Sequence, residues 1–116
     1  MAREKNFYGH TQQEVIQQTL DAAKLEAVSL GEIVSDGQMF DLEGDELVAF
    51  VRKDILALLE SGARIVGQST DKGGEWAVQQ EFDLPNDEAA EKVLQLWESG
   101  GRAAAFLAWF YNGSVN

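Results

Sequence analysis

Residues 45–62 read DELVAFVRKDILALLESG, and this stretch decides the fold class. Its apolar residues recur at steps of three and four, which is the spacing of one helix face. They are Leu47, Val48, Val51, Ile55, Leu58 and Leu59. Gly62 stands where a helix commonly ends in the left-handed conformation. The stretch therefore predicts a helix over 45–61 that buries one broad face.

One polar residue interrupts this apolar face. At 100° per residue, Asp54 falls between Phe50, Leu47 and Leu58. A desolvated carboxylate at that position would have a raised pKa or need a partner such as Arg64. We expect a salt bridge at the edge of the core or a cap to a neighbouring loop, and we keep Asp54 as a candidate functional carboxylate.

The segment before this helix predicts a helix and a hairpin. Thr11 and Glu14 form a T-x-x-E capping box, so a helix is expected to begin there and to end near 29–31. Residues 1–9 are expected to form a mobile arm. In 32–40, EIVSDGQMF, the pair Asp36-Gly37 stands between two short apolar runs, which favours a type I′ hairpin.

The segment after this helix predicts a second hairpin and a further helix. Residues 63–69, ARIVGQS, and 75–82, EWAVQQEF, are expected to be strands. The second run alternates apolar and polar residues, as in a strand with one wet face. Pro85, followed by Asn86 or Asp87, predicts the start of a helix that Gly100 and Gly101 end.

The C-terminal stretch 103–111, AAAFLAWFY, is apolar throughout. As a strand it would place Trp109 and Tyr111 on one face and Phe110 on the other. We favour a strand over a short helix. A strand that is apolar on both faces belongs inside a sheet or at an edge that a partner covers.

Together these elements predict one compact α+β domain over 10–116. The expected order is α-ββ-α-ββ-α-β, with about three helices packed on a mainly antiparallel sheet of about five strands.

The composition excludes several classes of function. Nine Lys and Arg against twenty Asp and Glu give the 116 residues a formal net charge of −11. A field of this sign repels nucleic acid and anionic membrane surfaces, so we expect neither as a partner. Without a cysteine, a secretion signal or an apolar run near the roughly 20 residues of a membrane span, we expect a cytoplasmic protein.

The motifs of common catalytic and metal sites are also missing. His10 is the only histidine, and it has neither a nucleophile elbow nor zinc-ligand spacing around it. Asp41, Glu43 and Asp45 have the spacing of a calcium loop, but Glu46 and Arg52 stand where that loop needs glycine and a bidentate acid. We therefore expect no metal, no cofactor and no enzymatic activity.

The excess of acid favours a protein-interaction module of the inhibitor or immunity type that binds a basic partner. The candidate contact residues are Asp36, Asp41, Glu43, Asp45, Glu46, Glu75, Gln79 and Glu81. One alternative is a homodimer that pairs through the C-terminal strand, with Trp109 and Tyr111 at the interface. Another is a small-molecule binder or enzyme with a pocket between helices and sheet.

Overall fold

Helix α3 (Gly44–Glu60) is the central helix of the domain. The computed structural model describes residues 3–68, 76–100 and 108–113, and within them α3 packs against α1, α2 and α4. Its buried residues follow the expected spacing and are Leu47, Phe50, Val51, Asp54, Ile55 and Leu58. The helix ends at Gly62, whose φ of 104° lies in the left-handed region that glycine tolerates. The predicted helix over 45–61 is confirmed.

Helix α1 (Gln12–Leu25) begins as its capping box predicts. The Thr11 hydroxyl accepts a hydrogen bond from the Glu14 amide, and the Glu14 carboxylate accepts one from the Thr11 amide. The helix ends before the expected 29–31, because Glu26 is already extended. The chain then enters strand β1 (Val28–Ser29).

Helix α2 (Leu30–Gln38) replaces the hairpin expected around Asp36-Gly37, so that prediction is wrong. A second capping box starts it: Ser29 and Glu32 exchange hydrogen bonds as Thr11 and Glu14 do. Gly37 has no positive φ and lies in the helix.

The sheet is antiparallel and has the strand order β1-β4-β2-β3. Strands β2 (Arg64–Gln68) and β3 (Trp76–Val78) form the expected second hairpin. Strand β4 (Trp109–Tyr111) lies between β1 and β2, with Phe110 paired to both Val28 and Ile65. Residues 103–107, which carry the rest of the apolar stretch, lie outside the described residues.

The strand expected over 75–82 ends at Val78. The chain turns into a 3₁₀ helix, η2 (Gln80–Phe82), which buries Phe82, and so the expected alternation of faces stops there. Helix α4 (Asn86–Gly100) follows and packs on α3. Its buried residues are Ala89, Ala90, Val93 and Leu94, whereas the expected Leu96 is 37% exposed.

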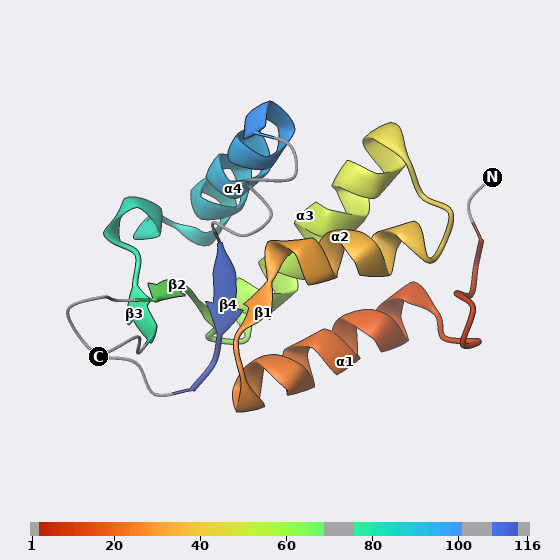
Figure 1. The fold of residues 1–116 in the computed structure, drawn as a ribbon, viewed down its shortest axis with the longest axis horizontal. Coiled ribbons are helices and arrows are strands. Elements are labelled where there is room, and N and C mark those ends of the chain that lie inside the picture. Colours follow the sequence, from red (N-terminus) through yellow and green to blue (C-terminus); the bar gives the residue numbers. More distant parts are fainter. Residues whose placement is uncertain (1–2, 69–75, 101–107, 114–116) are drawn as a thin grey trace.

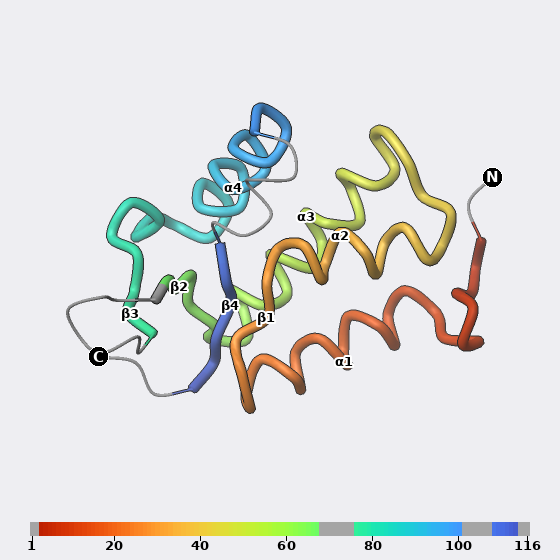
Figure 2. The backbone as a smooth tube through the Cα atoms, in the orientation of Figure 1, coloured from red at the N-terminus to blue at the C-terminus, as the bar shows by residue number. Residues whose placement is uncertain are grey.

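Figure 1 shows α1, α2 and α3 on one side of the molecule and the sheet on the other, with α4 beside the sheet. Figure 2 traces the chain from the end of α1 through the short β1 into α2, so that these two helices lie together against α3. Within the described ranges the domain thus has four α-helices and a four-stranded antiparallel sheet. The fold class expected from the sequence is confirmed, with one helix more and one strand fewer.

Candidate functional site

Asp54 is the most unusual polar residue among those the structure describes. It lies in the middle of the buried face of α3 and is 0% exposed. Neither carboxylate oxygen has a hydrogen-bond partner. A buried ionised carboxylate without a partner costs a protein several kcal/mol, and so its presence calls for a physical explanation.

Helix α2 brings a second carboxyl to Asp54 because of a close helix approach. A Cβ atom on Gly37 would lie 2.6 Å from Leu47 Cδ1 and 2.8 Å from Phe50 Cδ1. Only glycine therefore allows α2 to lie this near α3. The adjacent Asp36 is half-buried, and its negative charge acts on Asp54. We call Asp36 and Asp54 the carboxyl pair.

Helix α1 adds one hydroxyl to this cluster. Thr19 is buried among the apolar residues of α1, and its Oγ1 donates to the Val15 carbonyl at 3.1 Å. Because that bond uses the single hydroxyl proton, the oxygens of Asp54 are left without a donor. The three helices thus bring three polar side chains together inside the core: Thr19, Asp36 and Asp54.

Both carboxyls of the pair hold their protons more tightly than ordinary aspartates do. Burial, and secondly the charge of Asp36, raise the pKa of Asp54 to about 7. Burial, and secondly the charge of Glu32, raise the pKa of Asp36 to about 6. The nearby Thr19 hydroxyl acts in the opposite direction on both pKa values. At pH 7 the pair therefore holds roughly half a proton, mainly on Asp54.

Asp36, the outer member of the carboxyl pair, lines a surface hollow of about 200 Å³ between α1 and α2, whereas the fully buried Asp54 does not reach it. The lining of the hollow is Val15, Gln18, Thr19, Ala22, Val28, Glu32 and Asp36. Thr19 and Asp36 line the hollow and also act on Asp54, so they connect solvent to the buried carboxyl. We call this feature the α1–α2 hollow.

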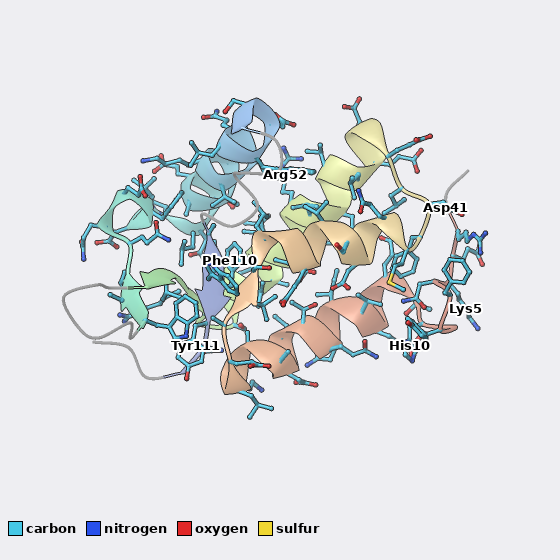
Figure 3. The ribbon with its side chains drawn as sticks, in the orientation of Figure 1. Lys5, His10, Asp41, Arg52, Phe110 and Tyr111 are labelled. Carbon is cyan, nitrogen blue, oxygen red and sulfur yellow. The ribbon has the colours of Figure 1, made fainter. Side chains whose placement is uncertain are left out.

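The other acids of the predicted contact surface are exposed. Asp41 and Glu43 lie between α2 and α3, and Asp45 and Glu46 follow at the start of α3; we call these four acids the acidic turn. The Arg3 side chain forms an ion pair with Asp41. Figure 3 places Asp41 and Lys5 together at one end of the long axis, well away from Phe110 and Tyr111 of β4. Asp45 and Glu46 lie in the first turn of α3, where the helix dipole favours negative charge.

The remaining predicted contact residues do not share one strand face. Glu75 lies outside the described residues. The Gln79 side chain is half-buried and donates to the Val66 carbonyl at 2.8 Å. Glu81 is exposed in η2, near Lys92, whose ammonium donates to the Glu81 carbonyl at 2.9 Å.

Trp109 and Tyr111 lie on the sheet face opposite the helix-covered core. Phe110 between them points into that core and is fully buried. The two expected interface residues are half-buried, and the Trp109 ring lies 5.2 Å from the ring of Trp76. The alternation predicted for this strand is thus confirmed over 109–111.

Arg64 is not the partner of Asp54, and that expectation is wrong. Arg64 is exposed on β2 and lines a cleft of about 550 Å³ between the sheet, η2 and the start of α4. The ionisable side chains that line this cleft are Arg64 and Asp83 alone. Among the described residues, these two do not make a nucleophile with an adjacent base.

In the part of the chain that the structure describes, no group of three or more His, Asp or Glu residues could hold a metal ion. His10 lies just before α1, and its ring Nδ1 is 3.4 Å from Nε2 of the Gln18 side chain. No helix within the described ranges is both long and apolar enough to cross a membrane.

Comparison with protein families, with curated proteins and with solved structures finds no match for this chain.

Thr19 and Glu32 are parts of the site that were not predicted from the sequence. Thr19 was visible as the one hydroxyl residue in the apolar face of α1, and Glu32 as the last residue of an S-x-x-E capping box.

Proposed function

We propose that this protein is a non-enzymatic acidic interaction module that acts in the cytoplasm and binds a basic protein. Its contact surface is the exposed side of α2 together with the acidic turn. Such a module neutralises its partner stoichiometrically, as an inhibitor or immunity-type protein does. Complementary charge of this kind speeds association and selects basic partners over acidic ones.

One observation carries this proposal: the acidic side chains of this surface outnumber the basic side chains of the protein that pair with them. Five exposed acids lie between 32 and 46, and they are Glu32, Asp41, Glu43, Asp45 and Glu46. Of these five acids, Asp41 is the one that forms an ion pair within the described residues, with Arg3. The rest of this negative surface is available to a partner.

The test begins with affinity capture from native lysate at low and at high salt, followed by identification and purification of the captured protein. Binding is then measured by calorimetry with Glu43→Gln/Asp45→Asn/Glu46→Gln. We expect this triple variant to raise the Kd at least about tenfold, because each lost charge contact is worth a few tenths to about 1 kcal/mol.

A matched control removes three charges elsewhere. Asp87→Asn/Glu88→Gln/Glu98→Gln has the same net charge but changes exposed acids of α4. We expect its Kd to stay within about threefold of the wild type, since only long-range attraction is reduced. Equal weakening in both triple variants would contradict a defined contact surface.

A second candidate function is self-association through the outer face of the sheet. It is supported by the half-buried aromatic side chains gathered there, Trp76, Trp109 and Tyr111. Aromatic side chains that gather on a surface and stay partly exposed commonly mark interfaces. Light scattering over a concentration series tests it, and a monomer at the highest concentration would rule it out.

A further inference from the structure

The α1–α2 hollow has the chemistry of a receptor for one long cationic side chain. Its apolar lining of Val15, Ala22 and Val28 suits an aliphatic stem. Its acids, Glu32 and Asp36, suit a cationic head. A lysine or arginine side chain combines these two parts in one group.

A second observation, independent of the acids that line the hollow, also indicates a missing cation. Asp54 is 0% exposed, and neither of its carboxylate oxygens has a hydrogen-bond partner. Thr19 and Asp36, which line the hollow, both act on its pKa. No basic side chain acts on either carboxyl: Asp36 acts on Asp54, and Glu32 acts on Asp36. From α1 only the uncharged Thr19 acts on the pair. From α4, the buried residues are apolar, and the charged Glu91 pairs with Arg52 at the exposed rim.

We propose that the α1–α2 hollow binds one lysine or arginine side chain of the basic partner, and that this binding releases to solvent the proton held by Asp36 and Asp54. The inference rests on the proposed function, since it names the anchor that the basic partner would insert. The positive charge takes the place of the proton, so no other reactant is needed.

The coupling has a definite direction. A proton and a cation compete for the same negative charge, and so affinity rises with pH until the pair is ionised. A group with a pKa of about 7 is roughly one tenth ionised at pH 6 and roughly nine tenths ionised at pH 8. The affinity of the hollow for a cation is therefore expected to rise about tenfold over this range.

The experiment uses short peptides on the whole protein. Acetyl-Gly-Lys-Gly-amide and its arginine counterpart are titrated into ¹⁵N-labelled protein, and the norleucine peptide serves as an uncharged isostere of lysine. We expect the lysine or the arginine peptide to shift the amides of α1 and α2 around Thr19 and Asp36, with a Kd about tenfold lower at pH 8 than at pH 6. The norleucine peptide should cause no such shifts.

A variant and a direct titration complete the test. Asp36→Asn should abolish the shifts, whereas Glu43→Gln, which removes one charge from the acidic turn, should keep them. If Asp36→Asn does not fold, the wild-type protein still decides: ¹³C carboxyl titration should show the Asp36 and Asp54 midpoints falling when the cationic peptide is present.

Each adverse result has a separate meaning. Equal shifts with norleucine and lysine would overturn this inference, because the hollow would then be only an apolar site. The absence of shifts with both cationic peptides would also overturn this inference. That holds even if the purified partner still binds the wild type and binds the acidic-turn variant more weakly. The proposed function itself would be overturned by a different result: no basic protein that binds the wild type, or equal weakening of partner binding in both triple variants.

Discussion

The carboxyl pair and the acidic turn use the same residue types in opposite surroundings. Asp36 and Asp54 meet inside the helix layer, where burial raises both pKa values. Asp41, Glu43, Asp45 and Glu46 are exposed to water only a few residues away in the sequence. Charges interact strongly in a dry interior and weakly in water. The pair should therefore respond to pH, and the turn should respond to salt.

The other interface of α3 emphasises how unusual the pair is. Where α3 meets α4, the buried residues of α4 are apolar, and the ion pair between Arg52 and Glu91 lies at the exposed rim, 2.6 Å from Nε to Oε1. That interface needs no buried charge to be stable. The buried carboxyl of Asp54, on the face of α3 toward α2, contrasts with this apolar packing.

The largest expected effect comes from removing the buried ionisable group. Asp54→Asn should become more stable relative to the wild type as pH rises, with the difference growing by roughly 3 kcal/mol between about pH 4.5 and pH 8. Denaturant unfolding at a series of pH values measures it.

Burial raises the pKa of Asp54 from its ordinary value of 3.8 to about 7. This shift sets the direction in which stability changes with pH. Between these two values the folded state binds more protons than the unfolded state, and so wild-type stability falls as pH rises. Below about pH 4 both states are protonated, and above about pH 7 the loss is complete. Parallel pH profiles for Asp54→Asn and the wild type would show that Asp54 is not buried as an acid.

The next largest effect should come from separating the two helices that form the pair. Gly37→Ala places a Cβ within 3 Å of Leu47 and Phe50 side-chain atoms, so we expect a loss of about 2 kcal/mol from overpacking. Moving α2 outward should also return the pKa of Asp36 toward its ordinary value. Ser35→Ala, on an exposed position of the same helix, is the control and should change stability by less than about 0.5 kcal/mol. Equal stability of the two variants would contradict the close approach.

Local patterns predicted the elements that local physics determines. The capping box at Thr11 and the repeat of α3 each depend on residues within a few turns, and both were confirmed. Helix α2 was missed because Asp36-Gly37 was interpreted as a turn. The actual reason for Gly37 is its contact with α3, through Leu47 and Phe50. Nothing in the residues adjacent to Gly37 contains that information.

The same limit applies to the sheet and the site. The insertion of β4 between β1 and β2 joins segments that are distant in the sequence, which no periodicity encodes. The helical repeat did predict that Asp54 lies on the apolar face. It did not predict Asp36 as its neighbour, because that juxtaposition depends on α2 being a helix.

A smaller effect is expected from Thr19→Val, which keeps the shape of the side chain and removes its hydroxyl. Because the Thr19 hydroxyl lowers the pKa values of both Asp36 and Asp54, the variant should raise both. Stability should change by less than about 1 kcal/mol, since the lost hydrogen bond to Val15 lies within one helix turn. Carboxyl ¹³C titration is the measurement. Unchanged midpoints would mean that Thr19 does not contact the pair.

The smallest effect should come from the acidic turn itself. Glu43→Gln/Asp45→Asn removes exposed charges, so the change in stability should stay within about 0.5 kcal/mol. Two opposing forces keep it small: repulsion among the acids is relieved, while Asp45 no longer interacts with the dipole at the start of α3. Any remaining difference should disappear in roughly 1 M salt, where the Debye length is about 3 Å. A difference that persists at about 1 M salt would mean that the turn contributes more than exposed charge and would remove the contrast with the carboxyl pair.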